Sequence, residues 1–162
     1  MLFPAININI VITVALVAGA LMGMLGGRGR LKPVIMSIYI GLVLATNFAE
    51  IVQPYLGLSL VQSSWILLTL PVIFFGAFGT IQNMAKGSLI LNLIIGMFTG
   101  ALLLTCAFML MPLRDQSALS GDSYMAYELQ QLRPWLLGLM PLAVLLLGIH
   151  LHHKKKKKHA KP

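Results

Sequence analysis

Long apolar stretches, separated by prolines and short polar segments, dominate this chain. Five of them reach or approach the roughly 20 residues that a helix needs to cross the apolar core of a membrane. With 58% hydrophobic and 10% charged residues, the chain has the composition of a membrane protein rather than of a soluble domain. The sequence therefore predicts an all-α bundle of about five transmembrane helices in a single domain, residues 1–151, followed by a basic tail, residues 152–162. The expected spans cover approximately residues 6–27, 34–53, 64–82, 88–111 and 134–151.

The distribution of basic residues predicts the orientation of this bundle. No positive side chain precedes the first apolar stretch, whereas a secretory signal normally carries positive charge there. We therefore interpret residues 6–27 as a retained span, although Ala18–Ala20 has the small residues of a cleavage site. Lysine and arginine concentrate in cytoplasmic loops. With five spans and the N-terminus outside, all of the 12 basic residues except Arg114 and Arg133 lie on the cytoplasmic side, where the C-terminus also lies.

Small residues recur every four positions in the first expected span and again in the fourth. A stripe of small residues on one helix face lets a second backbone approach closely. We therefore expect the spans 6–27 and 88–111 to pack closely, either against each other or against a second copy of the chain. The small residues concerned are Ala15, Gly19, Gly23, Gly27, Gly96 and Gly100.

Two basic clusters follow apolar stretches and are expected to lie at the cytoplasmic surface. Each lysine or arginine near anionic lipid adds about 1 kcal/mol of attraction, so anionic lipid is the expected partner. The lysine run also serves as a stop-transfer anchor for the last span. Nucleic acid is not expected, because the tail has no interleaved aromatic residues. The residues concerned are Arg28, Arg30, Lys32, Lys154, Lys155, Lys156, Lys157 and Lys158.

The longest connection, residues 113–133, is too polar to cross a membrane. Met125, Leu129 and Leu132 are spaced to share one face of a helix, with turn and capping residues at 120–123 before it. This pattern predicts an amphipathic helix on the outer surface, as an ordinary connection or as a lid. Exposed aromatic residues would then lie at the headgroup level. These are Tyr124, Tyr127 and Trp135.

Glu50 is the only acidic residue within the expected spans. Asn47 shares its helical face, and Asn7 and Asn9 begin the first span at a similar depth on the same side. An ionisable residue inside a membrane is a functional candidate by default, so these four could line an outward-facing polar pocket for a cation or a proton. The alternative is that Glu50 reaches interfacial water or pairs with an outer arginine.

Catalytic and metal-binding motifs are missing from the sequence. No metalloprotease, nucleophile-elbow, phosphate-loop or dinucleotide motif is found. The single cysteine, Cys106, lies in an apolar run, and the four histidines lie around the lysine run. We therefore predict a non-enzymatic protein with no catalytic, cofactor-binding or metal-binding residues.

Three short segments carry a family resemblance. The first is the run from Gly23 to Gly29, followed by a second helix with Ser37 and Gly41; the others are LILNLIIGMFTGALLL at 89–104 and the outer segment that begins at Asp122. Over roughly residues 6–135 the chain resembles the colicin V production protein family, CvpA. It departs from that family in having Thr99, where members often carry an arginine beside the last glycine, and in its fifth span and lysine tail.

The resemblance implies a bacterial inner-membrane protein that supports toxin or protein export, or envelope homeostasis. It carries over no catalytic residues. Its partners would be other membrane proteins or a second copy of the chain. Two alternatives stay open: a small transporter or channel built around Glu50, and a holin-like pore former.

Overall fold

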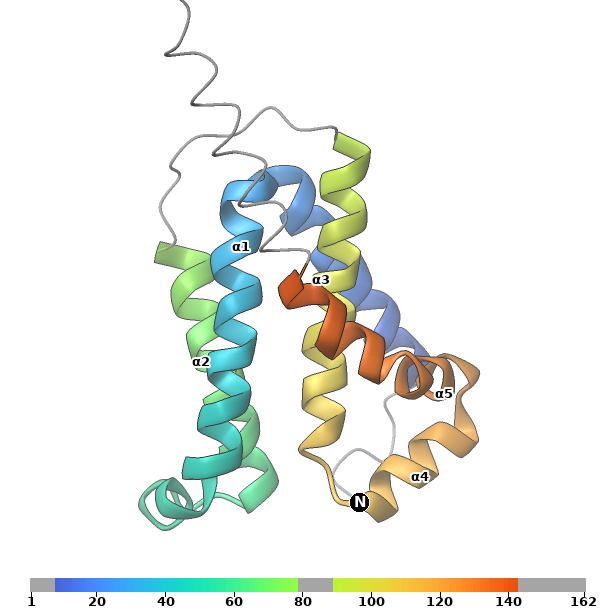
Figure 1. Cartoon of the computed structure of the whole chain (residues 1–162). Helices are drawn as coiled ribbons and strands as arrows, with labels where there is room; N and C mark the ends of the chain where they lie inside the picture. Colours follow the sequence, from blue (N-terminus) through green and yellow to red (C-terminus); the bar gives the residue numbers. More distant parts are fainter. Residues whose placement is uncertain (1–7, 79–88, 143–162) are drawn as a thin grey trace, which may run out of the picture.

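The computed structural model describes residues 8–78 and 89–142, and every regular element in these ranges is a helix (Figure 1). The all-α prediction is confirmed for this part of the chain. Residues 133–142 are also helical. The elements are α1 (Ile8–Leu56), α2 (Leu60–Phe78), α3 (Leu89–Met109), α4 (Leu113–Asp122) and α5 (Tyr124–Gln131).

The long element α1 consists of two helices joined at Gly27. This residue has φ 58° and ψ −170°, a backbone conformation essentially restricted to glycine. The chain reverses there, so that Ile8–Gly27 and Leu31–Leu56 run in opposite directions (Figure 1). The second half extends beyond the prolines that bounded the expected span, since Pro33 and Pro54 both lie inside the helix.

Three helical segments are long and apolar enough to cross a membrane. They are Ile8–Gly27, Leu31–Leu56 and Leu89–Met109, with 20, 26 and 21 residues. These lengths are consistent with a membrane protein and with the expected spans 6–27, 34–53 and 88–111. The apolar part of α2 is shorter, and only the first residues of the expected fifth span, 134–142, are described. The total of five spans stays a prediction.

Helix α2 begins four residues before the expected start of the third span. The backbone N–H of Gln62 donates to Ser59 Oγ at 3.3 Å, and the backbone N–H of Ser59 donates to Gln62 Oε1 at 3.0 Å. This reciprocal pair is a capping box, which satisfies two backbone donors that a helix start leaves free. Gly57, with φ 63°, forms the turn from α1. Ser59 and Gln62 therefore start the helix instead of preceding it.

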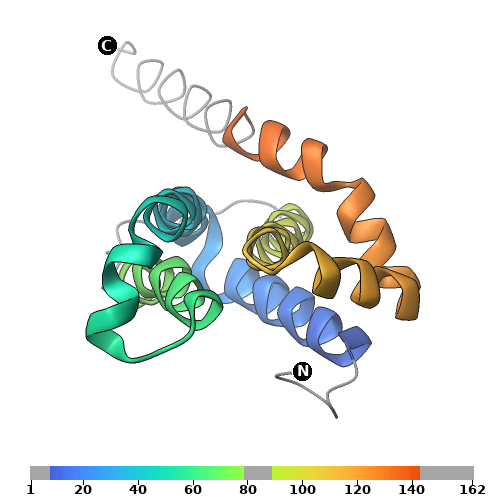
Figure 2. The ribbon, with the colours of Figure 1, turned by 90° about the horizontal axis from the view of Figure 1, so that it is seen from below.

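The two halves of α1 form the centre of the bundle. The first half packs against α3 and the second half against α2, whereas α2 and α3 touch little (Figures 1 and 2). The Tyr39 hydroxyl donates to the Leu137 carbonyl at 2.9 Å and so joins the second half to the helical segment 133–142. The outward face of the first half is apolar and at least half exposed, as a lipid-facing surface would be. Its residues are Ile10, Val14, Val17, Leu21 and Leu25.

The helix expected in the second half of the connection 113–133 is present as α5, and part of it packs on the rest of the chain. Ser123 is its N-cap and accepts a hydrogen bond from the Ala126 N–H at 3.2 Å. Ala126 and Leu129 are buried, whereas Met125 and Leu132 are 39% and 47% exposed. Of the three apolar residues expected on one face, the chain itself buries Leu129, and contact of Met125 and Leu132 with a membrane stays a prediction. The buried face starts at the N-cap because α5 packs on the beginning of α1 through Ser123.

The first part of the outer connection is also helical. Helix α4 covers Leu113–Asp122, where we expected no helix, and it includes the first three residues of the expected turn at 120–123. The backbone N–H groups of Asp115 and Gln116 donate to the Pro112 carbonyl, at 2.9 and 3.0 Å. Pro112 has φ −57° and precedes the first turn, so it ends the apolar span and starts the polar helix.

Candidate functional site

The backbones of α1 and α3 are in direct contact, and we call this contact the α1–α3 seam. It is formed by three small residues of α1, Ala15, Gly19 and Gly23, and by three residues of α3, Asn92, Gly96 and Gly100. A Cβ atom added to Gly23 would overlap the Asn92 carbonyl oxygen, and one added to Gly96 would overlap the Gly19 carbonyl oxygen. A Cβ on Gly19 would also lie 2.9 Å from the Gly100 nitrogen. Both helices therefore contribute glycines to the same surface, which a side chain on either would force apart.

The stripe predicted on the first span is thus covered by α3 of the same chain. Ala15 lies against Gly100, since a Cβ on Gly100 would overlap the Ala15 carbonyl oxygen. Gly27 differs from the others: among the described residues that are not its neighbours in the chain, the atom near its added Cβ is Asn92 Nδ2, at 3.8 Å. Gly27 is required for its backbone conformation, as the joint of α1, more than for close packing.

A second close contact joins α1 to α2, and its residues were not singled out in the sequence as a packing face. On α1, buried small residues again recur every four positions, and we call this contact the α1–α2 seam. A Cβ on Gly41 would overlap the Leu68 carbonyl oxygen and lie 3.0 Å from its Cα. The four-residue spacing could have identified this stripe too, because it is the same pattern as in the first half. The buried small residues at this spacing are Ser37, Gly41, Ala45 and Ala49.

Of the three pocket candidates that the structure describes, Asn9 lies apart from Asn47 and Glu50. Asn7 lies outside the described residues. Asn9 is hydrogen-bonded to Ser123, at the start of α1 beside α5. The Asn47 amide donates to the Val43 carbonyl at 2.8 Å, and Glu50 is exposed. The end of α1 lies on the other side of the bundle from α5, so a single pocket cannot include both groups (Figures 1 and 2).

The basic residues predicted to contact lipid are described only in part. Lys32 is half-buried in the first turn after the Gly27 joint. The side chains of Arg28 and Arg30 and the whole lysine run lie outside the described residues. The joint and the ends of α2 and α3 nearest to the undescribed residues 79–88 lie at one end of the bundle (Figure 1).

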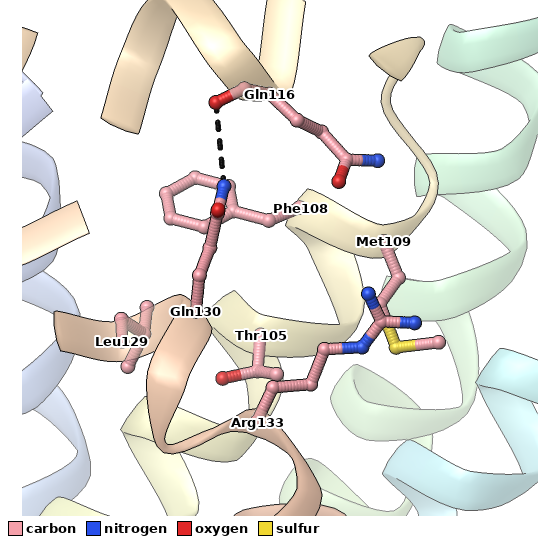
Figure 3. Close-up of a pocket in the computed structure, with 7 residues that line it drawn as sticks. All are labelled: Thr105, Phe108, Met109, Gln116, Leu129, Gln130 and Arg133. Carbon is pink, nitrogen blue, oxygen red and sulfur yellow. Dashed lines mark hydrogen bonds between the residues drawn. The ribbon is translucent and has the colours of Figure 1, made fainter. Parts of the chain in front are cut away.

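A shallow pocket lies at the opposite end, where α3, α4 and α5 meet (Figure 3). It is a small depression that is partly open to solvent. The Gln130 amide donates to the Gln116 carbonyl across it at 3.3 Å, and Gln116 donates to the Met111 carbonyl at 2.7 Å. Sequence reasoning missed this pocket, because its members are far apart in the chain. They are Thr105, Phe108, Met109, Gln116, Leu129, Gln130 and Arg133.

Residues 8–78 and 89–142 contain few side chains suited to metal binding or to acid–base catalysis. No group of three or more histidine, cysteine, aspartate or glutamate side chains lies close enough there to hold a metal ion. Cys106 is a fully buried free thiol. Outside the spans, the Glu128 carboxylate accepts a hydrogen bond from Tyr124 and raises the pKa of that phenol.

The described part of the chain is therefore an all-helical protein with three helices suited to cross a membrane and two glycine-dependent seams. Comparison with protein-family models, with curated proteins and with solved structures finds no match.

Proposed function

We propose that this protein is a multi-pass protein of the bacterial inner membrane that acts without enzymatic chemistry, in toxin or protein export or in envelope homeostasis. This role is the one implied by the resemblance to the CvpA family. The protein would act through contacts with other membrane proteins. Its N-terminus would be outside and its C-terminus in the cytoplasm, where the basic clusters contact anionic lipid.

The main support for this proposal is the kind of polar side chain that is buried inside the bundle. Among the described residues, the buried polar side chains are hydroxyls and one amide, with no carboxylate, lysine, arginine or histidine. Thr99 and Thr105 each donate to a carbonyl one turn earlier in α3, at 2.8 Å. Ser37 likewise donates to the Val34 carbonyl at 2.7 Å. Hydroxyls bonded to their own helix do not line a path for ions, which favours a packed scaffold over a transporter.

The apolar exterior supports the same proposal. Ile73 and Phe74 on α2 are 68% and 55% exposed, and Ile90 on α3 is 69% exposed. In a membrane such surfaces face lipid or another helix, and neither contact needs a catalytic group. The α1–α3 seam is closed within the chain, so any partner or second copy would have to bind these outer faces instead.

Complementation in the native bacterium tests the proposed role. Deletion of the gene is expected to reduce toxin or protein export or to sensitise the envelope to detergent, and the wild-type gene should restore it. Glu50→Gln should restore it equally, because no proton or cation passes through that carboxylate. An unaffected deletion strain would contradict the export or envelope role. Failure of Glu50→Gln at normal protein levels would favour the transporter alternative.

Two further measurements separate the alternatives. Purified protein in liposomes should give no ion or proton flux, and wild-type flux that Glu50→Gln abolishes would establish the transporter. Overexpression should leave the membrane potential intact, whereas rapid depolarisation would establish a holin-like pore former.

Reporter fusions test the proposed topology. A reporter that is active only outside the cytoplasm should be inactive when fused after Pro162. It should be active when fused at the turn after Gly57, which follows the second span. Activity after Pro162 would overturn the five-span arrangement.

A further inference from the structure

We propose that the pocket between α3, α4 and α5 binds the phosphate of a membrane phospholipid, with Arg133 as the cationic contact. The inference rests on the membrane placement proposed above. It adds a specific lipid site at the end of the bundle opposite to the predicted basic clusters.

The charge of the pocket points to an anion. Arg133 is half-buried, and its guanidinium extends toward Met109 at the end of α3 (Figure 3). None of the side chains that line the pocket is acidic. Among the side chains that the structure describes, no carboxylate forms an ion pair with Arg133, and Glu128 is hydrogen-bonded to Tyr124. A partly desolvated guanidinium without a carboxylate gains free energy when an anion binds.

The neutral polar groups fit the same ligand. Gln116 and Gln130 lie across the pocket from Arg133 and are joined by a hydrogen bond, which holds α4 against α5 (Figure 3). Their amides and the guanidinium can all donate to phosphate oxygens. A planar guanidinium binds phosphate with two parallel hydrogen bonds, which a lysine cannot do.

The surroundings favour a lipid as the source of that phosphate. Phe108 and Met109 form the apolar wall of the pocket at the last turn of α3, where a membrane span ends. Tyr124 and Trp135, in the same outer layer, are 76% and 63% exposed. Exposed aromatic residues of this kind lie at the headgroup level. The pocket therefore lies at the depth of lipid phosphates, with an apolar wall for the start of an acyl chain.

Native mass spectrometry in detergent tests the site by counting lipids retained per chain. The probes are phosphatidylglycerol, diacylglycerol with the same chains, and inorganic phosphate. Wild-type protein should retain phosphatidylglycerol and not diacylglycerol. Arg133→Gln should weaken that retention about tenfold, as expected for the loss of a charge-assisted hydrogen bond. Arg114→Gln is the matched control, because Arg114 is exposed on α4 and does not line the pocket.

The results distinguish a lipid phosphate from free phosphate, and a site at Arg133 from lipid binding elsewhere on the protein. Equal retention by Arg133→Gln and Arg114→Gln would overturn the proposal, provided that thermal unfolding shows both variants to be folded. Retention of diacylglycerol by the wild type would overturn it without any variant. If an equal concentration of inorganic phosphate displaces phosphatidylglycerol, the proposal of a lipid ligand is overturned, and the ligand of the pocket is a free anion. A membrane-inserted protein that binds no lipid here would refute this site alone and leave the proposed function standing.

Discussion

Both seams of α1 depend on glycines that let two helix backbones touch, but the glycines are distributed differently between the paired helices. In the α1–α3 seam, Gly19 and Gly23 meet Gly96, so both helices lack side chains where their backbones touch. In the α1–α2 seam, only α1 contributes a glycine, Gly41, and it lies against the backbone of Leu68. Where both helices contribute glycines, neither can accept a side chain at the contact without separating from the other. In the α1–α2 seam, where only α1 contributes a glycine, α2 can move away from an added side chain.

The neighbours of α2 and α3 strengthen this difference. Ten of the 21 residues of α3 are buried. In the described part of α2 the buried residues are only four, Ser63, Ser64, Leu68 and Pro71, and its main neighbour is α1. A helix held on one side can tilt or shift as a rigid body to relieve an overlap. We therefore expect substitutions at the α1–α3 seam to cost more stability than equivalent ones at the α1–α2 seam.

The largest effect is expected for Gly23→Leu. A side chain there meets the Asn92 backbone and lies 3.1 Å from Gly96 Cα, so α1 and α3 must separate. The cost should exceed about 3 kcal/mol, the upper end of the usual cost of overpacking. Unfolding by sodium dodecyl sulfate in mixed micelles measures it. The control is Gly138→Leu, at a position where an added Cβ meets nothing within 4 Å. Equal stability of both variants would show that the seam is open in the membrane.

Gly27→Ala tests the joint between the seams. An alanine at φ 58° and ψ −170° occupies a backbone region essentially restricted to glycine, at a cost of about 1 to 3 kcal/mol. Space is not the reason, since the nearest atom to its Cβ would be 3.8 Å away. The same unfolding assay should therefore show destabilisation, and Gly121→Ala, with nothing near its Cβ, should show none. A neutral Gly27→Ala would mean that the chain reverses at another residue.

The four-residue spacing in the sequence identified the glycines of the α1–α3 seam but not Gly41 of the α1–α2 seam. Gly19 and Gly23 stood out because only glycines fill that stretch of the stripe, whereas Ser37, Gly41 and Ala45 mix three residue types. The spacing also did not show which helix packs on the stripe of the first span. The same small residues would be needed for a helix of the same chain and for a helix of a second copy. The three-dimensional contact of Gly23 with Asn92 assigns it to α3.

The polar candidates were harder to place from sequence. Glu50, Asn47 and Asn9 share a predicted depth, but depth does not fix the position around the bundle. The structure separates them because Asn9 is held by Ser123 of the outer helix. The pocket at Arg133 depends on three helices that meet only in the fold, so no local pattern could reveal it.

Gly41→Ala should show the smaller cost of the one-sided seam. The added methyl group overlaps the Leu68 carbonyl, and α2 can move away, so the loss should be about 1 to 2 kcal/mol. Gly23→Ala, measured beside it, should lose more. Gly76→Ala on α2 is the control: its Cβ would lie 4.0 Å from Val34 Cγ2, and alanine's helix propensity should stabilise it by up to about 1 kcal/mol. If Gly41→Ala costs as much as Gly23→Ala, the two seams are equally rigid.

The smallest effect is expected for Ser63→Ala, which asks whether hydrogen bonds stabilise the α1–α2 seam. Ser63 is fully buried, and its Oγ has no hydrogen-bond partner among the described residues. Removing a buried hydroxyl without a partner leaves nothing unsatisfied, so stability should be unchanged or rise by up to about 1 kcal/mol. Ser123→Ala is the contrasting variant, since it removes a helix N-cap and should cost about 1 kcal/mol. A loss at Ser63 as large as that at Ser123 would mean that its hydroxyl bonds across the seam in the membrane, and that α2 is held by more than close packing on Gly41.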